Sequence, residues 1–335
     1  MHYTYRPINL DTDFDTYYAM YRTEYLEKYG SFNMSENEVR NEFNSPEFDI
    51  NQDTQVAFTD DGRIAGYAAI FADYELPVRP RLFAYVMPEH RGQGIGTKLT
   101  KWGIKRAKAV FECVPNDARV VLQSWALLDD EMQLLENMGY IHIRQSLYMK
   151  IEFDTAPAEV KFPETMNLVT FAEHPHLEDF ARIQQASFHD HRGFVAQPLE
   201  KVVEVWQSHI DAAQEFIPEW VLMLKDSTKD VSMVFAWSFS EEEADRAYIE
   251  FIGVMPDYRR RGLGMKLLQH IFSEIYKRGI HKAALSVDGA SLTGAVQLYE
   301  KAGMYIAHTY KAYELELRSG VEYTNQGQGS ETVVE

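Results

Sequence analysis

VMPDYRRRGLG, residues Val254–Gly264, repeats VMPEHRGQGIG at residues Val86–Gly96. The two stretches are 168 residues apart, since 254 minus 86 and 264 minus 96 both give 168. A second match follows in the same order: Leu298–Met304 resembles Leu134–Tyr140, at an offset of 164 (298 minus 134). Self-similarity in the same order along a chain indicates a duplicated structural unit. The sequence therefore predicts two homologous domains.

The repeat also sets the expected domain boundaries. The N-terminal copy is expected over residues 1–153 and the C-terminal copy over residues 166–317, each ending in a strand-like stretch. Residues 154–165 contain prolines, which prevent helix continuation and favour extended neighbours, so they are predicted to be a linker. Residues 318–335 are rich in Gly, Gln, Ser and Glu and are predicted to form a mobile polar tail.

The composition is that of an ordinary globular protein. The chain has 335 residues, of which 45% are hydrophobic and 25% are charged, and this length is sufficient for two domains. Apolar runs stay well below the roughly 20 residues of a membrane-spanning helix, and the first residues lack the pattern of a secretion signal. The single cysteine, Cys113, cannot form an internal disulfide. We therefore expect a cytoplasmic protein that does not enter a membrane.

The formal net charge of −18 restricts the possible partners. Nucleic acid is not expected as a partner, because a phosphate backbone requires a basic protein surface. An acidic surface favours solubility and also attracts cationic substrates such as amines. A polyanionic cofactor would have to be bound by a local site whose attraction outweighs the negative charge of the whole protein.

Each copy shows the same expected order of elements: a helical region, a hairpin, a central strand, the Gly-rich turn, a helix, a strand, and a final helix and strand. Asp61-Gly62 between two apolar runs is a hairpin signal in the N-terminal copy. The helix after the second Gly-rich turn has an apolar stripe of the kind that packs on a sheet, formed by Leu267, Leu268, Ile271, Phe272 and Ile275. The pattern predicts an α/β (α+β) fold of two tandem domains, each a central mixed sheet flanked by helices.

The Gly-rich turn in each copy is predicted to bind an anion. A strand that runs into a glycine-rich helix start presents unpaired backbone N–H groups and the positive end of the helix dipole, which together suit a pyrophosphate. The nucleoside triphosphate loop and the dinucleotide fingerprint do not fit, because Gly-Lys-Ser/Thr and G-x-G-x-x-G are both missing. The remaining pattern is Arg-x-x-Gly-x-Gly, at Arg91–Gly96 and Arg259–Gly264. The alternative is a plain strand-to-helix connection with glycines for packing.

These segments resemble the GNAT superfamily of N-acetyltransferases, over roughly residues 1–153 and 166–317, and loosely its tandem-domain branch that contains the mycothiol synthases. The resemblance implies that the loop backbone holds the pyrophosphate of acetyl-CoA, or of another acyl-CoA, as co-substrate, and that no metal is needed. In the C-terminal copy it assigns these contacts to Val254, Arg259, Arg260, Arg261, Gly262, Leu263, Gly264 and Met265. In the N-terminal copy it assigns them to Val86, Arg91, Gln93, Gly94, Ile95, Gly96 and Thr97.

The resemblance also implies a general acid. GNAT enzymes commonly carry a tyrosine for protonating the leaving thiolate in a Leu-Tyr-x-x-x-Gly pattern, which Leu298–Gly303 matches, so Tyr299 is the candidate. The alternative is a tyrosine that only packs and forms a hydrogen bond. Leu135 stands at the corresponding place of the N-terminal copy and cannot donate a proton. We therefore expect the N-terminal copy to be catalytically weak or inactive, while its loop keeps the pattern for binding coenzyme A.

Glu250 is the candidate general base. It lies on the strand that leads into the second Gly-rich turn, where a carboxylate could deprotonate an ammonium directly or through a water. A salt-bridge role is an equally valid reading. The asparagine that the family often has ahead of the final helix has no match, since Ser291 stands nearest to that place. The resemblance therefore assigns no pantetheine contact to that point.

The loop Ser187–Phe194 follows the first helix of the C-terminal copy, and such loops line the acceptor pocket in proteins of this superfamily. His191 and Phe194 are the candidate substrate contacts, with an ordinary surface loop as the alternative. The His-Asp-His sequence has no further Cys or His at ligand spacing, so no metal is expected. Cys113 has no neighbouring histidine and is interpreted as a bystander.

Two functions follow from these patterns. The first is an N-acetyltransferase that moves an acetyl group to a primary amine of a small molecule by direct attack in a ternary complex, with the chemistry in the C-terminal domain. The second is a non-catalytic acyl-CoA-binding or scaffold protein. Tyr299 favours the first, whereas Leu135 and Ser291 favour the second. The acceptor and the oligomeric state cannot be read from the sequence.

Overall fold

The structure is a computed structural model and describes residues 2–45, 48–72, 76–111, 114–191, 194–213, 215–290 and 294–323. By its internal contacts the chain divides into two compact units. The N-terminal unit contains Met1–Gln145 and Tyr310–Tyr323, and the C-terminal unit contains Ser146–Thr309. Each unit has a mixed sheet flanked by helices, which confirms the predicted α/β class. Among the described residues, no helix combines the length and the apolar character that crossing a membrane requires.

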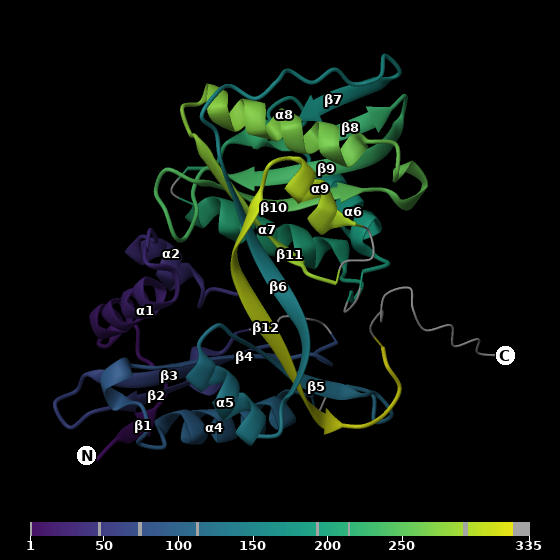
Figure 1. The fold of residues 1–335 in the computed structure, drawn as a ribbon. Helices are drawn as coiled ribbons and strands as arrows, with labels where there is room; N and C mark the ends of the chain where they lie inside the picture. Colours follow the sequence, from purple (N-terminus) through teal and green to yellow (C-terminus); the bar gives the residue numbers. More distant parts are fainter. Residues whose placement is uncertain are drawn as a thin grey trace. The chain divides into compact units, whose positions relative to one another are not determined.

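The N-terminal unit is built on a sheet with the strand order β1-β2-β3-β4-β5-β12 (Figure 1). Its neighbouring strands are antiparallel, except β4 and β5, which are parallel and pair at Arg81 and Gln123. The elements of this half of the chain are β1 (Thr4–Arg6), α1 (Phe14–Tyr29), α2 (Glu36–Asn41), α3 (Ile50–Asp53), β2 (Thr54–Phe58), β3 (Ile64–Phe71), β4 (Arg81–Val86), the 3₁₀ turn η1 (Pro88–His90), α4 (Ile95–Val110), β5 (Val120–Ala126), α5 (Asp129–Asn137) and β6 (Ile141–Glu152).

The C-terminal unit repeats this plan, with the strand order β6-β11-β10-β9-β8-β7. Here β10 and β11 are the parallel pair. Its elements are β7 (Met166–Thr170), α6 (Leu177–Phe188), α7 (Leu199–Ala212), η3 (Pro218–Trp220), β8 (Val221–Asp226), β9 (Lys229–Trp237), β10 (Ala247–Val254), η4 (Pro256–Tyr258), α8 (Leu263–Lys277), β11 (Lys282–Asp288), α9 (Ala295–Lys301) and β12 (Tyr305–Arg318).

Helices cover both faces of each sheet because each helix buries one apolar stripe. In the C-terminal unit the predicted stripe of α8 is at most 2% exposed at every position, from Leu267 to Ile275, and packs with β9, β10 and β11. The opposite face is covered by α6 and α7, where Phe180 and Trp206 join an aromatic cluster with Phe235. In the N-terminal unit α4 and α1 form the two corresponding cores with the strands.

The last strand of each half of the chain completes the sheet of the other unit. Ser146–Glu152 of β6 pairs antiparallel with β11 in the C-terminal unit. Lys311–Arg318 of β12 pairs antiparallel with β5 in the N-terminal unit. The boundaries expected at residues 153 and 317 follow the order of the chain, whereas the contacts exchange these two strands. A repeat identifies a final strand in each copy, but it does not say which sheet edge that strand joins.

The end of the chain also contacts the N-terminal unit further than the expected tail boundary suggests. Val321 forms a parallel bridge with Ala118, and the Glu322 carboxylate accepts hydrogen bonds from Arg79 and Arg119 at 3.1 and 3.0 Å. Residues 324–335 of the expected tail lie outside the described residues.

Candidate active site

Two parallel strands separate beside the second Gly-rich corner. Among the described residues, β10 and β11 pair at Ala247–Ala283 and Tyr248–Ala284, at the start of both strands. Beyond these pairs each strand continues to its own C-terminal end, at Val254 and at Asp288. The inner edge of β10 from Glu250 onward is therefore free of the ladder to β11. A free strand edge can bind an extended group through its backbone.

The corner that follows β10 concentrates backbone N–H groups. Arg260 and Gly262 both have left-handed backbone conformations, with φ of 62° and 76°, and α8 starts immediately after them. The first intrahelical bond to Gly262 comes from the N–H of Lys266, at 3.1 Å. The N–H groups of the first three residues, Leu263–Met265, therefore have no acceptor within the helix. Left-handed residues directly ahead of a helix start help to gather backbone N–H groups into a concave anion site.

The two glycines of this corner have different roles. A Cβ added at Gly262 would meet nothing within 4 Å, so this face of the loop is open. A Cβ added at Gly264 would lie 3.2 Å from Leu298 Cδ1, and one at Gly96 would lie 2.8 Å from Leu134 Cδ2. Close packing against the following helix therefore favours a small residue at Gly264, as it does at Gly96.

The first arginine of each Arg-x-x-Gly-x-Gly segment holds the loop in place. Arg259 Nε donates to the carbonyl oxygen of Val254 at 3.1 Å, and its Nη atoms donate to Asp190 at 2.5 and 2.8 Å. The hydrogen bonds from Arg259 keep the pKa of Asp190 below its ordinary value. Arg91 repeats this arrangement in the N-terminal unit, with Val86 at 3.1 Å and Glu27 at 2.8 and 2.6 Å. Both guanidinium groups are thus already paired with carboxylates.

The next two arginines, Arg260 and Arg261, are exposed. Arg260 is an exposed residue, and Arg261 donates to the carbonyl oxygen of Asp257 at 2.7 Å while its guanidinium carbon lies 4.6 Å from the centre of the Tyr258 ring. Their positive charge adds to that of the helix start. The residue pattern does not distinguish the three arginines. The structure shows that Arg259 is paired with Asp190, whereas Arg260 and Arg261 are exposed.

Tyr299 combines a buried ring with an unengaged hydroxyl. It belongs to α9, its side chain is 7% exposed, and it packs in the same core as α8. Within the described part of the chain its hydroxyl forms no hydrogen bond, yet it is not sealed from solvent. Burial raises its pKa well above the ordinary value, so the group keeps its proton at neutral pH. It can therefore donate a hydrogen bond to a group that enters the site.

Glu250 lies at an irregularity of β10. The pairing with β9 shifts register between Ile249 and Phe251, and Glu250 is the extra residue of this bulge. Desolvation by surrounding protein, and then the negative charge of Glu241, raise the pKa of Glu250 to about 7, although a hydrogen bond from Trp237 lowers it. Its side chain is nevertheless exposed to solvent. A carboxyl group that is both reachable and titrates near neutral pH can act as a base.

The N-terminal unit keeps the corner but lacks both of these groups. Gly92 and Gly94 have φ of 73° and 80°, like Arg260 and Gly262. However, β3 and β4 pair in unbroken register from Phe71–Arg81 to Gly66–Val86, so no bulge residue corresponds to Glu250. The contacts of Leu134 with Gly96 and of Leu298 with Gly264 align α5 with α9. In this alignment the buried Leu135 of α5 is the residue equivalent to Tyr299 of α9.

The remaining N-terminal candidates line the same corner. The Gln93 Oε1 atom accepts a hydrogen bond from the Tyr3 hydroxyl at 2.7 Å. Ile95 is buried at the start of α4, and Thr97 follows it in the first turn. The unit thus repeats the backbone geometry of the corner without counterparts of Tyr299 and Glu250.

The candidate acceptor contacts, His191 and Phe194, follow Asp190, which pairs with Arg259. His191 is half-buried, its ring centre is 4.7 Å from that of Phe188, and its backbone carbonyl oxygen accepts from the N–H of Phe194 at 3.2 Å. Desolvation lowers the pKa of His191, whereas the charges of Asp190 and Asp288 raise it. Since Asp288 ends β11, its charge acts on His191 from the end of that strand. Asp190 of the His-Asp-His sequence is engaged by Arg259.

Three further points complete the site. Among the described residues, no group of three or more His, Cys, Asp or Glu side chains has the geometry to hold a metal ion. Ser291 and Cys113 lie outside the described residues. The sequence reading missed Trp237 and Glu241, which act on Glu250, because a bulge leaves no pattern in the residue types.

Comparison with known proteins agrees with this geometry. The pattern of the acetyltransferase (GNAT) family matches residues 15–120 and 170–304. The chain is 23% identical to a mycothiol acetyltransferase of Saccharopolyspora erythraea, over 72% of this chain and 78% of that one. It is 38% identical to the ribosomal protein bS18 alanine N-acetyltransferase of Escherichia coli, over 23% of this chain and 52% of that one.

A solved structure extends the likeness to nearly the whole chain. It is a GCN5-related N-acetyltransferase from Sphaerobacter thermophilus, 27% identical, with a TM-score of 0.77 over 96% of this chain and 97% of that one. Two matched regions, two Gly-rich corners of the same geometry and a shared fold lead to one conclusion: this chain belongs to the acetyltransferase (GNAT) family, as a tandem-domain member.

Proposed function

We propose that the C-terminal unit transfers an acetyl group from acetyl-CoA to a primary amine of a small molecule, by direct attack in a ternary complex. GNAT proteins generally use acetyl-CoA. The observation that carries the assignment to this unit is the hydroxyl of Tyr299 on α9, which forms no hydrogen bond in the described part of the chain. The equivalent residue of the other unit is Leu135, which has no hydroxyl. The N-terminal unit then has a supporting role.

The residues of the Gly-rich corner fit the diphosphate of the co-substrate. The N–H groups of Leu263–Met265 and the left-handed Arg260 and Gly262 form the anion site, and Gly262 leaves its face open. Arg260 and Arg261 add exposed positive charge. The free inner edge of β10, up to Val254, is suited to pair with an extended amide-containing arm.

Glu250 has the proton affinity that the acceptor requires. An amine arrives largely as an ammonium and must lose a proton before its lone pair can attack. A carboxylate with a pKa of about 7 is partly ionised at neutral pH and still basic enough to accept that proton, directly or through a water. Glu250 then releases this first proton to solvent. During attack a C–N bond forms and the thioester C–S bond breaks, and the second amine proton passes to the carboxylate of Glu250, which is free to accept again.

Tyr299 is suited to the leaving group. A free thiol has a pKa of roughly 8.5, so the sulfur can depart as a thiolate. Because burial raises the pKa of Tyr299, its hydroxyl acts first as a hydrogen-bond donor to the developing negative charge. The thiolate then takes up a proton from solvent to give the free thiol, so that overall one of the two protons lost by the ammonium is released.

The acceptor is proposed to be small and cationic. The net charge of −18 and the aspartate and glutamate side chains near the separated strands, Asp288 and Glu241, favour a positively charged molecule. One relative is named mycothiol acetyltransferase and another ribosomal protein bS18 alanine N-acetyltransferase, so the names of relatives include a small molecule and a protein.

Thiol release tests this function. Purified protein is incubated with acetyl-CoA and a panel of small primary amines, and the free thiol is measured over time against a no-amine control. We expect amine-dependent, continuous release. Binding of acetyl-CoA without release for any amine, together with no acetylation of peptide amines, would instead support the non-catalytic acyl-CoA-binding alternative.

A further inference from the structure

Lys150 and Glu314 occupy equivalent places in the two exchanged strands. Lys150 of β6 pairs with Ala284 of β11, and Ala284 also pairs with Tyr248 of the neighbouring parallel strand. Glu314 of β12 pairs with Gln123 of β5, which in turn pairs with Arg81. The sequence agrees, since 314 minus 150 gives 164, the offset found for the preceding helices. Equivalent positions of a duplicated fold thus carry opposite charges.

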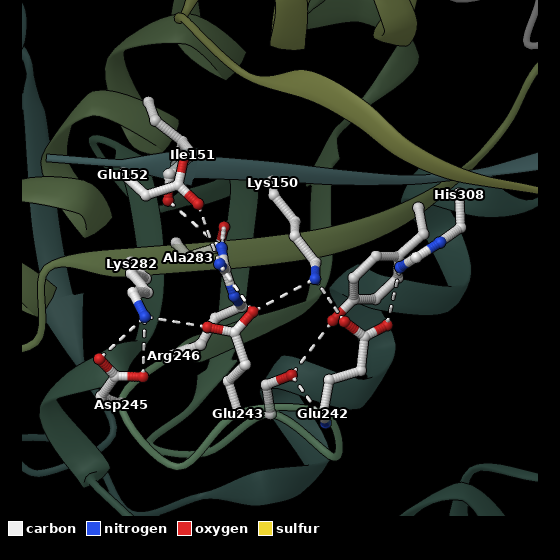
Figure 2. Close-up of polar contacts among 12 residues, drawn as sticks. Lys150, Ile151, Glu152, Glu242, Glu243, Asp245, Arg246, Lys282, Ala283 and His308 are labelled. Atoms are coloured by element: carbon white, nitrogen blue, oxygen red, sulfur yellow. Dashed lines mark hydrogen bonds and ion pairs between the residues drawn. The ribbon is translucent and has the colours of Figure 1, made fainter. Parts of the chain in front are cut away.

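Lys150 enters a negatively charged and buried place in the C-terminal unit (Figure 2). Its side chain is 9% exposed, and its Nζ lies 2.5 Å from Glu242 Oε2 and 3.3 Å from Glu243 Oε1. Although burial raises the pKa of Glu243, hydrogen bonds from Lys282, Arg246 and Lys150 bring it down to about 2. Both carboxylates come from the segment between β9 and β10.

Arg246 in the same cluster is already neutralised. Its Nη2 atom lies 3.0 Å from both Glu152 Oε1 and Glu243 Oε1, and its Nη1 faces the carbonyl oxygens of Ile151 and Ala283 at 3.5 and 3.3 Å. The positive charge that balances Glu242 therefore comes mainly from Lys150.

Glu314 enters a positively charged and buried place in the N-terminal unit. Its side chain is 5% exposed, its Oε1 accepts from Arg79 Nη1 at 2.5 Å and from Gln123 Nε2 at 3.0 Å, and its Oε2 lies 3.9 Å from Arg119 Nη2. Arg79 is itself 5% exposed at its side chain. A buried arginine of this kind requires a carboxylate partner. Arg79 has two, Glu314 and, at 3.1 Å, Glu322, and both belong to β12 or to the residues that follow it.

We propose that this pair of opposite charges specifies the strand exchange: Lys150 directs β6 to the sheet edge at β11, and Glu314 directs β12 to the sheet edge at β5. With unexchanged strands, Lys150 would be buried beside Arg79 and Arg119, and Glu314 beside Glu242 and Glu243. Like charges in buried surroundings cost far more than exposed ones. Each edge is thus an interaction surface whose partner is the final strand of the other half.

Charge reversal in the full-length chain tests the proposal. Lys150→Glu and Glu314→Lys each place a like charge in a buried cluster, and we expect each to lower the Tm by on the order of 10 °C. The matched control is Lys311→Glu on the same strand as Glu314, which is expected to change the Tm by about 2 °C or less. If a reversed variant does not accumulate, Lys150→Met and Glu314→Gln are measured instead. They remove the charge without reversing it, and each is expected to lower the Tm by less than the reversal would.

The double reversal decides whether charge selects the partner. In Lys150→Glu/Glu314→Lys, unexchanged strands would match the charges of both clusters again. We therefore expect a higher Tm than in either single variant, together with a change of strand partner.

Cysteine pairs report that partner in a Cys113→Ser background. Ala126→Cys with Lys311→Cys reports exchange, because these residues are register partners. Ala126→Cys with Leu147→Cys reports unexchanged strands, because 311 minus 147 also gives 164. With native charges we expect the disulfide to form in the Ala126→Cys/Lys311→Cys pair. After the double reversal we expect it to form in the Ala126→Cys/Leu147→Cys pair instead. In both cases the oxidised protein should run at monomer size on a denaturing gel. Additive loss of Tm with the first disulfide retained, or single variants that behave like the control, would overturn the proposal.

Discussion

The guanidinium group of Arg259 donates to both carboxylate oxygens of Asp190, at 2.5 and 2.8 Å, and so ties the Gly-rich corner to the segment after α6. Its Nη2 also donates to the carbonyl oxygen of Ser187 at 2.9 Å. The pair is partly buried, with side-chain exposures of 22% and 19%. A bidentate contact of this kind fixes orientation as well as charge.

Asp190→Asn is predicted to loosen the corner. Loss of one charged acceptor should lower stability by about 1–2 kcal/mol and raise the KM for acetyl-CoA several-fold, with a smaller effect on kcat. Glu27→Gln, which weakens the equivalent contact of Arg91, is the matched control. It should lower the Tm similarly while leaving the KM unchanged, and a raised KM in both variants would contradict the assignment of the site to one unit.

Tyr299→Phe is predicted to reduce kcat while leaving acetyl-CoA affinity unchanged. The substitution keeps the buried ring and removes only the hydroxyl, which has no partner to lose in the described part of the chain. Removal of a catalytic donor typically costs about 10²-fold or more in rate. Steady-state kinetics and calorimetric titration with acetyl-CoA provide the two measurements.

The control for Tyr299 is Tyr140→Phe in the N-terminal unit. The Tyr140 hydroxyl is buried without a hydrogen-bond partner among the described residues, so its removal should leave turnover unchanged and stability equal or higher. Full turnover of Tyr299→Phe would exclude the proposed role.

The pH dependence should report Glu250. Because its pKa is raised to about 7, kcat/KM is expected to rise as the pH increases through about 7, where the carboxyl group becomes a base. Glu250→Gln should lower the rate by on the order of 10²-fold and remove this limb. For stability the sign is reversed: a raised carboxyl pKa destabilises the fold above that pKa. The Tm of Glu250→Gln relative to the parent should therefore be more favourable at pH 8 than at pH 5.

Trp237→Phe tests the surroundings of Glu250. The indole hydrogen bond lowers the pKa of Glu250, so its removal should move the acid limb to higher pH. Trp206→Phe, in the same aromatic cluster, should leave the limb in place. A shift of equal size in both variants would point to a general packing effect.

Arg260 and Gly262 are two residues apart, both have left-handed backbones, and their substitutions have opposite expected effects. Arg260→Gly relieves a left-handed backbone at a residue with a Cβ, with φ of 62°, and should stabilise the fold by up to about 1 kcal/mol. Gly262→Val introduces the same strain and covers the open face, so it should lower both the Tm and the acetyl-CoA affinity. Gly92 is the residue of the N-terminal unit that is equivalent to Arg260. As a control, Gly92→Arg places a Cβ at this left-handed position and should lower the Tm by a similar amount to the gain in Arg260→Gly.

The residue pattern alone predicted the duplication, the mixed sheet, the apolar stripe of α8 and the Gly-rich corners. The stripe and the corners depend on neighbours within one turn or one strand, which local spacing reports directly. The duplication follows from the repeated sequence, and the mixed sheet from the order of the elements. It also separated Tyr299 from Leu135, because these residues follow the same leucine in the two copies.

Other features were decided only when distant segments met. The engagement of Arg259 by Asp190 joins residues 69 positions apart, and the need for Gly264 comes from Leu298 on another helix. The Glu250 bulge depends on how β9 and β10 align. The exchanged strands depend on which sheet edge offers Lys150 and Glu314 a countercharge. Spacing along the chain carries no information on such contacts, because they are set by packing and by the cost of burying an unpaired charge.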